Sequence, residues 1–217
     1  MIELEQRGDV WVVHMRNDEN RFNRPSVDAL HAALDEVDAV EGPAALVITG
    51  EGKFFSNGLD LDWVMAGGDG TEGFIDDVHR LLGRVLGFAS VTVAAVNGHA
   101  FAGGGMLAVA HDYIVMREDR GFWCLPEVDL GLPLTPAMFA VVAAHLPAQA
   151  LQDSCLSGRR YSGPEALAAG IVDEVAAEAD VLDRAVARAA ELADKNRGVI
   201  REHKRLLYGD ALTTCGL

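Results

Sequence analysis

The sequence predicts an α/β fold in which helices cover a partly parallel sheet. Continuous apolar runs at 45–49 and 91–96, and a weaker one at 113–116, are typical of strands that are covered on both faces. Helical patterns at 75–86 and 106–111 lie between these runs. Because strands and helices alternate along the chain, we expect most strands to be parallel.

The first forty residues predict a hairpin and then a helix. Strands are expected at 2–5 and 10–15, because β-branched alternation flanks a glycine turn at 7–9. Asn23 or Ser26 can cap a helix whose apolar residues recur at spacings of three and four. This helix should end before Gly42-Pro43.

The last third of the sequence is predicted to be helical. Helices are expected at 136–146, 148–156 and 181–194, with another opened by the capping box that begins at Ser162 and stopped by Gly170. The glycine-rich stretch 66–71 lacks the features of a phosphate-binding loop, and we expect a surface loop or lid there.

Composition narrows the possible partners and the cellular setting. A net charge of −15 disfavours nucleic acid and anionic membranes as partners. The N-terminus lacks the pattern of a signal peptide and there is no 18-residue apolar run, so a soluble, cytoplasmic protein is expected. Three irregularly spaced cysteines and seven histidines without zinc-ligand spacing indicate neither disulfides nor a metal site.

Two glycine-bearing segments could supply backbone amides to a ligand. Gly58 allows a tight turn that exposes the amide of Leu59, and the glycines from Gly103 onward follow a predicted strand and open a helix. Two amides that converge on one point form an oxyanion hole, worth about 3 to 4 kcal/mol per donor in the transition state. The alternative is a pair of tight turns that bind nothing.

A third segment places Glu127 directly after Pro126 in apolar surroundings. Such a carboxylate is either salt-bridged or desolvated, and a desolvated one has a raised pKa that suits a general base. Asp129, two residues later, is expected to point away from Glu127 in an extended segment and to be structural.

Together the three segments resemble the crotonase superfamily, also called the enoyl-CoA hydratase/isomerase family. The similarity extends from the opening hairpin to the segment 157–173. It implies repeated ββα units that form two roughly perpendicular sheets, with an acyl-CoA core at 1–160 and a C-terminal helical region at 161–217 for assembly as a homotrimer or dimer of trimers. It also implies that the oxyanion amides belong to Leu59 and Gly103, and that no separate cofactor is needed.

Within that family the acid and base residues distinguish the reactions. Family hydratases use two glutamates, and here the first of these positions is Met106 and the second is Glu127. One carboxylate suffices to shift a double bond, and the local pattern is similar to plant peroxisomal Δ3,Δ2-enoyl-CoA isomerases. The dienoyl-CoA isomerase branch has an aspartate where this chain has Thr135, which argues against that branch.

The resemblance also implies a set of residues around the substrate. Besides the residues above, substrate or CoA contacts are expected from Arg21, Asn23, Asn57, Asp60, Leu61, Phe101, Ala102, Met106, Pro126, Thr135 and Lys204. Arg24, Arg201 and Arg205 are further candidates for the CoA phosphates, although a solvated helix face is the alternative for the last two. Trp63, Met65 and Phe74 could line an acyl pocket or belong to the core.

Two other functions stay open from the sequence. One is an enoyl-CoA hydratase or another hydrolase or lyase of the same fold. The other is a non-catalytic acyl-CoA-binding homologue, which Met106 permits and Glu127 argues against.

Overall fold

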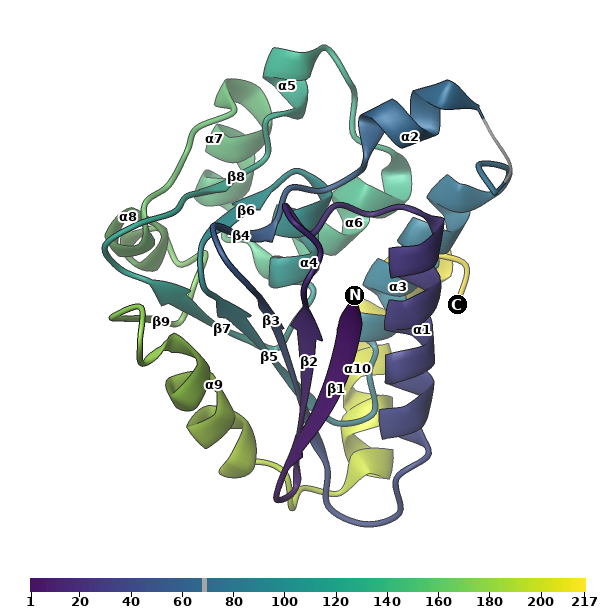
Figure 1. Cartoon of the computed structure of the whole chain (residues 1–217), viewed down its shortest axis with the longest axis vertical. Helices are drawn as coiled ribbons and strands as arrows, with labels where there is room; N and C mark the ends of the chain where they lie inside the picture. Colours follow the sequence, from purple (N-terminus) through teal and green to yellow (C-terminus); the bar gives the residue numbers. More distant parts are fainter. Residues whose placement is uncertain (68–69) are drawn as a thin grey trace.

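The apolar runs of the sequence form the middle strands of a six-stranded sheet, here called the main sheet. The computed structural model describes residues 1–67 and 70–217, so residues 68 and 69 of the glycine-rich loop lie outside the described residues (Figure 1). The strand order is β1-β2-β3-β5-β7-β9, and only the β1–β2 hairpin is antiparallel. Its strands are β1 (Ile2–Arg7), β2 (Val10–Met15), β3 (Ala45–Gly50), β5 (Val91–Val96), β7 (Tyr113–Arg117) and β9 (Glu174–Ala176).

A second, three-stranded sheet, here called the small sheet, was not predicted element by element. Its order is β4-β6-β8, and all of its pairings are parallel. The strands are β4 (Phe54–Ser56), β6 (His99–Phe101) and β8 (Trp123–Cys124). The presence of two sheets agrees with the predicted fold class.

Ten helices are described among residues 1–67 and 70–217. They are α1 (Arg24–Asp38), α2 (Leu61–Ala66), α3 (Phe74–Leu86), α4 (Gly103–Val109), α5 (Glu127–Leu130), α6 (Pro136–His145), α7 (Ala148–Ser157), α8 (Gly163–Ala168), α9 (Val181–Ala190) and α10 (Arg197–Thr214). The helix expected at 106–111 begins three residues earlier, and the one expected at 181–194 ends four residues earlier.

The middle strands are apolar throughout because both faces of the main sheet are covered. Side chains alternate along β3, so that Leu46 and Ile48 join the larger core, whereas Ala45 and Val47 face α9 in a second cluster. Figure 1 shows α9 on one side of the main sheet and α1, α3 and α10 on the other.

The C-terminal region is built into this same fold. Tyr161 pairs with Trp123, β9 extends the main sheet beside β7, and α9 covers one of its faces. Residues 161–217 therefore pack as one unit with the core, and their role in assembly stays a prediction.

Candidate active site

The small sheet brings the three predicted segments to one edge. Its strands are parallel, so their carboxyl ends lie together. Leu59 follows the end of β4 by three residues, Gly103 follows β6 by two, and Glu127 follows β8 by three. The predicted amides and the predicted carboxylate therefore follow the same edge of the small sheet.

The two glycine-bearing loops touch at this edge. A Cβ added to Gly58 would lie 2.8 Å from the amide nitrogen of Gly103, which shows how closely the two backbones approach. The neighbouring backbone is held in place by Phe22, whose amide donates to Gly58 and whose carbonyl accepts from Asp60. Among residues 1–67 and 70–217, neither the Leu59 amide nor the Gly103 amide has a hydrogen-bond partner. Both donors remain available to a ligand.

The glycines of α4 serve packing as well as access. A Cβ on Gly104 would lie 2.2 Å from the carbonyl oxygen of Ser56, and one on Gly105 would lie 3.1 Å from that of Cys124. Only glycine lets α4 lie this close to β4 and β8. Ala102 has a strained backbone conformation, with φ +50°, at the turn from β6 into α4. Gly103 is therefore the first residue of α4, where a backbone amide has no acceptor within the helix.

Glu127 opens the short helix α5 and is largely enclosed. Its Oε2 atom is buried and has no hydrogen-bond partner among the described residues. Burial raises the pKa of the Glu127 carboxyl, and its own backbone amide opposes this only in part. No cation pairs with Glu127 in the described part of the chain, so the carboxylate is desolvated and not salt-bridged.

The expectation for Asp129 was wrong in one respect. Residues 127–130 form a helix and not an extended segment, because the Asp129 and Leu130 amides both donate to the Pro126 carbonyl. Asp129 is exposed and lies near Gly158.

A cavity of about 450 Å³ opens beside Glu127. Glu127 contributes the only carboxylate among the described residues that line it, and most of the others are apolar. The residues that line this Glu127 cavity are Leu125, Glu127, Val128, Gly131, Leu132, Pro133, Leu134, Phe139 and Cys155. An apolar recess around one carboxylate suits a hydrophobic ligand with a proton to transfer.

Most of the residues that line this cavity were not predicted from the sequence. Leu134, Phe139 and Cys155 come from the loop after α5 and from α6 and α7, which the chain brings back to Glu127. The one available signal was the apolar run directly after Glu127.

The raised pKa of Glu127 has a consequence for stability. In the unfolded chain the Glu127 carboxyl releases its proton near the ordinary pKa of 4.5, whereas in the folded protein it holds the proton to a higher pH. The free energy of unfolding therefore falls as the pH rises through the raised pKa of the folded state. We expect Glu127→Gln to have a Tm a few degrees above wild type at neutral pH, with the difference vanishing below about pH 4.5. Thermal unfolding across this pH range tests it, and a pH-independent difference would contradict it.

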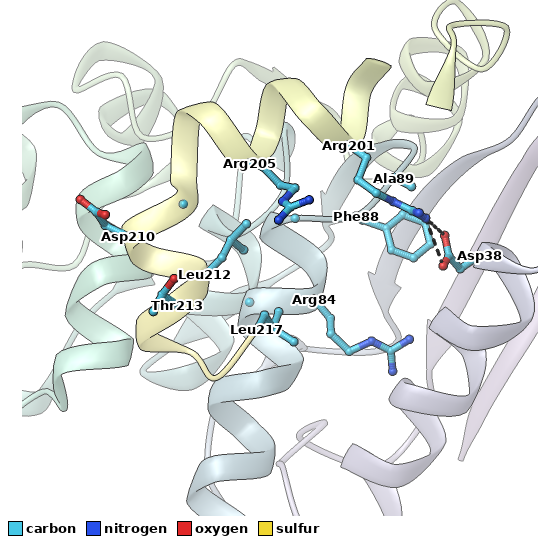
Figure 2. Close-up of a pocket in the computed structure, with 13 residues that line it drawn as sticks. Asp38, Arg84, Phe88, Ala89, Arg201, Arg205, Asp210, Leu212, Thr213 and Leu217 are labelled. Atoms are coloured by element: carbon cyan, nitrogen blue, oxygen red, sulfur yellow. Dashed lines mark hydrogen bonds and ion pairs between the residues drawn. The ribbon is translucent and has the colours of Figure 1, made fainter. Parts of the chain in front are cut away.

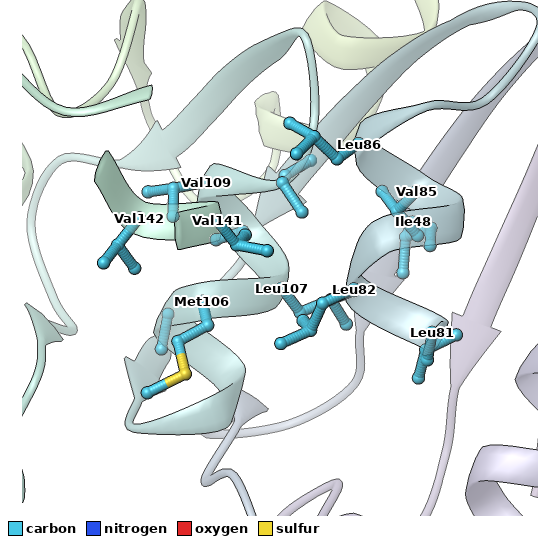
Figure 3. Close-up of a cluster of buried hydrophobic side chains, with 14 of the residues drawn as sticks. Ile48, Leu81, Leu82, Val85, Leu86, Met106, Leu107, Val109, Val141 and Val142 are labelled. Atoms are coloured by element: carbon cyan, nitrogen blue, oxygen red, sulfur yellow. The ribbon is translucent and has the colours of Figure 1, made fainter. Parts of the chain in front are cut away.

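Met106 lies in the core. Its side chain is 1% exposed, and it is absent from the lining of the Glu127 cavity. Figure 3 shows Met106 on the same helix as Leu107 and Val109, and all three belong to the larger hydrophobic core. A methionine there has no proton to exchange.

Four predicted polar residues make local contacts around the site. Asn57 donates to Glu19 at 2.8 Å, and Arg21 pairs with the same carboxylate at 2.7 Å. Asn23 caps α1 and Asp60 caps α2. These side chains fix the loops that flank Leu59.

The remaining residues predicted to contact the substrate lie on four different parts of the fold. Thr135 caps α6, and its hydroxyl lies 2.9 Å from Nε2 of His79 on α3. Leu61 begins α2, Pro126 precedes α5, and the Phe101 ring lies on the outer face of the small sheet beside His99.

Of the aromatic and apolar candidates for an acyl pocket, Trp63 and Phe74 pack against each other, with ring centroids 4.8 Å apart. Phe74 is buried in the core, whereas Met65 is exposed.

The other arginine candidates are engaged by carboxylates. Arg24 pairs with Asp77, Arg201 with Asp38 at 3.2 Å, and the exposed Arg205 with Glu202 at 3.6 Å.

Arg201 and Arg205 line a cavity of about 640 Å³ between α3 and α10 (Figure 2). This cavity is larger than the one at Glu127, but residues 87–89 on its border lead into the amino end of β5. The Leu59 and Gly103 amides instead follow the carboxyl ends of β4 and β6. The segments predicted to carry the chemistry follow the strands of the small sheet, so the Glu127 cavity is the candidate active site.

The structure corrects the expectation for Lys204. Its side chain is buried at 5% exposure, pairs with Asp112 at 2.7 Å and donates to the Ser90 carbonyl. Asp112 also accepts from Thr92 at the start of β5, so this cluster lies at the amino ends of main-sheet strands, whereas the candidate site follows the carboxyl ends of the small-sheet strands. Lys204 anchors α10 to the main sheet and is not free to meet CoA phosphates at the site.

Removing this buried ammonium should be costly. We expect Lys204→Met to lower the free energy of unfolding by about 3 kcal/mol or more, because Asp112 would be left buried without its counter-charge. Lys195→Met, which removes an exposed lysine paired with Asp194, should change it by less than about 0.5 kcal/mol. Urea unfolding of both variants measures the contrast, and equal losses would contradict the anchoring role.

Within residues 1–67 and 70–217, no group of three or more His, Cys, Asp and Glu side chains could hold a metal ion. None of the helices described there is both long and apolar enough to cross a membrane.

Known proteins resemble this chain in sequence and in fold. The family model for enoyl-CoA hydratase/isomerase matches residues 5–212. Enoyl-CoA delta isomerase 3 of Arabidopsis thaliana is 36% identical, over 96% of this chain and 92% of its own length. Among solved structures, the apo enoyl-CoA isomerase of Mycobacterium tuberculosis has a TM-score of 0.90 at 29% identity, covering 99% of this chain and 94% of that one. An enoyl-CoA hydratase from Mycobacterium marinum also has a TM-score of 0.90, at 27% identity, with the same coverage of both chains. The chain belongs to the enoyl-CoA hydratase/isomerase family.

Proposed function

We propose that this protein is a Δ3,Δ2-enoyl-CoA isomerase, which moves the double bond of a 3-enoyl-CoA to the 2-position in fatty acid β-oxidation. One observation carries the proposal. A single desolvated carboxylate, Glu127, faces an apolar cavity at the edge where two free amides lie, while Met106 is buried in the core. The names of the Arabidopsis relative and of the Mycobacterium tuberculosis structure support the same reaction.

In this mechanism the amides stabilise negative charge and the carboxylate transfers the proton. The thioester oxygen accepts hydrogen bonds from the Leu59 and Gly103 amides, which stabilise the negative charge that develops on it. Glu127 removes a proton from C2, and the electron pair delocalises into a dienolate. The same carboxyl group then returns the proton to C4, so that the double bond ends between C2 and C3 and no atom is gained or lost.

Hydration makes a greater demand on the site. Water must be activated at C3 while a proton is delivered to C2, and family hydratases use two glutamates for these tasks. Here the position of the first is Met106, which can do neither. Thr135 has a hydroxyl but caps α6 and bonds to His79, so it is no substitute carboxylate.

The assay is direct. With 3-hexenoyl-CoA as substrate, we expect the absorbance of the conjugated 2-enoyl thioester to rise. A 3-hydroxyacyl product from a 2-enoyl substrate, release of free CoA, or binding without turnover across a panel of acyl-CoAs would contradict the proposal. These three results correspond to a hydratase, a hydrolase and a non-catalytic homologue.

The setting of the enzyme is part of the same proposal. We place it in the cytoplasm, acting on an acyl-CoA without a separate cofactor, as a homotrimer or dimer of trimers. Arg21, one of the predicted CoA contacts, is bridged to the Leu59 loop through Glu19 and Asn57.

A further inference from the structure

Ser56, the last residue of β4, is a fully buried polar residue close to the Leu59 amide. It is 0% exposed. Its hydroxyl donates to the Asn20 carbonyl at 2.7 Å and accepts from the Gly58 amide at 3.2 Å. A hydroxyl has one proton and two acceptor lone pairs, so the donation to Asn20 leaves a lone pair for Gly58. Ser56 therefore links the loop before α1 to the turn that carries the Leu59 amide.

The Asn20 carbonyl is itself held in place. Asn20 is 3% exposed and has φ +51°, a left-handed conformation that asparagine adopts more readily than most residues. Its side chain donates to the Phe54 carbonyl at 3.0 Å and accepts from the Asn17 amide at 2.9 Å. These bonds tie Asn20 to the start of β4, so the acceptor of the Ser56 proton moves with the strand that carries Ser56.

Gly58 is held through both its amide and its carbonyl. The amide has the Ser56 hydroxyl as its acceptor and no other among the described residues, and the carbonyl accepts from the Phe22 amide at 2.7 Å. The carbonyl of Gly58 and the amide of Leu59 belong to one planar trans peptide, in which they point in opposite directions. The bond from Phe22 therefore directs the Leu59 N–H away from Phe22. The bond to Ser56 holds the Gly58 amide at the other end of the residue, so the two bonds together set the direction of the Leu59 N–H.

Ser56 also packs against the helix that carries the second amide. A Cβ added to Gly104 would lie 2.7 Å from the Ser56 Cβ and 2.2 Å from its carbonyl oxygen. The Gly103 nitrogen in turn lies 2.8 Å from the position that a Cβ on Gly58 would take. One buried residue thus meets both backbones that present the amides. An oxyanion hole needs each donor at about 2.7 to 3.1 Å from one oxygen, so the spacing of these backbones matters.

We propose that Ser56 is a positioning residue, whose hydroxyl holds the Leu59 amide at the distance from the Gly103 amide that a thioester oxygen requires. The proposal rests on the proposed function, because the two amides share a ligand only if an acyl thioester binds there. Ser56 is fully buried, so it neither touches the substrate nor transfers a proton. A misplacement of about 1 Å can cost about 100-fold in rate even when the altered residue lies outside the chemistry.

Ser56→Ala tests the proposal, with Thr49→Val as the matched control. Thr49 is buried at 4% exposure, and its hydroxyl also donates to a backbone carbonyl, that of Ala95 at 2.9 Å in the main sheet. Each variant loses one buried hydroxyl, so both should unfold at a lower temperature than wild type. Only Ser56→Ala should lower kcat for 3-hexenoyl-CoA, by about 10-fold to 100-fold, because the displaced amide acts mainly in the transition state. KM should change little.

A spectroscopic measurement separates the position of the amides from stability and from turnover. The double bonds of 2,4-hexadienoyl-CoA are already conjugated with its thioester, and hydrogen bonds to the thioester oxygen shift its absorbance to longer wavelength. We expect this shift when the compound binds to wild type and to Thr49→Val, and a smaller shift when it is saturated with Ser56→Ala. Circular dichroism checks that each variant is folded.

Two results would overturn the role of Ser56 alone. They are a full wild-type shift with folded Ser56→Ala, or equal losses of kcat in Ser56→Ala and Thr49→Val. A shift with wild type but no isomerisation of 3-hexenoyl-CoA would instead contradict the proposed function, while the compared shifts would still test Ser56. No shift with wild type would contradict both, because there would be no pair of amides to position.

Asn20→Gly takes the place of Ser56→Ala if that variant does not fold. Glycine adopts the same positive φ without strain but lacks the bonds to Phe54 and Asn17 that hold the Asn20 carbonyl. We expect a smaller shift and a lower kcat than in wild type. A wild-type shift with folded Asn20→Gly would then overturn the proposal.

Discussion

Glu127→Gln should lower kcat/KM for 3-hexenoyl-CoA isomerisation by about 100-fold to 10,000-fold, the range expected when a positioned proton-transfer group is lost. Glutamine keeps the size of the side chain, so substrate binding should change little. The buried Oε2 atom has no partner among the described residues, which leaves no structural role for the negative charge. The loss should therefore appear mainly in kcat.

Asp129→Asn is the matched control for this variant. It removes a carboxylate two residues away on the same short helix, where the side chain is exposed and outside the Glu127 cavity. We expect kcat/KM within about threefold of wild type, as for most surface substitutions. If Asp129→Asn loses as much activity as Glu127→Gln, the assignment of the base is wrong.

Gly58→Ala should damage both stability and catalysis. The residue has φ +75°, and an added Cβ would lie 2.8 Å from the Gly103 nitrogen. We expect a loss of about 1 to 2 kcal/mol from the backbone conformation. Separation of the two amides should reduce kcat by about 100-fold to 1,000-fold.

Gly52→Ala separates these two effects. Gly52 has the same φ of +75°, but an added Cβ would meet nothing within 4 Å. The stability loss should therefore match only the part of the Gly58→Ala loss that comes from the backbone conformation, while kcat stays near the wild-type value. Urea unfolding and isomerase kinetics on both variants make the comparison. Unchanged kcat in Gly58→Ala would show that the two amides do not act together.

The sequence predicted the long elements of the fold because their patterns persist over several turns or several strand residues. The runs at 45–49 and 91–96 became β3 and β5 because both faces of the main sheet are covered. The small sheet escaped prediction, since strands of two or three residues are too short to establish a period. Helix α4 begins earlier than expected because its first three residues are glycines, which have a low helix propensity. The close packing of α4 against β4 and β8 requires glycine at these positions.

The site was predictable as a set of residues and not as an arrangement. Glu127, Leu59 and Gly103 were named from local features and a family resemblance, but only the small sheet explains why they meet. Lys204 was misjudged because its partner, Asp112, lies ninety-two residues away in sequence.

The central claim is that one carboxylate serves both carbon atoms while two amides hold the thioester oxygen. A crystal structure with a non-reactive acyl-CoA analogue tests this most directly. We expect the thioester oxygen at about 2.7 to 3.1 Å from the Leu59 and Gly103 nitrogens, with the Glu127 carboxylate against both C2 and C4. A thioester oxygen bound elsewhere, or a Glu127 carboxylate that reaches only one of the two carbons, would contradict the account.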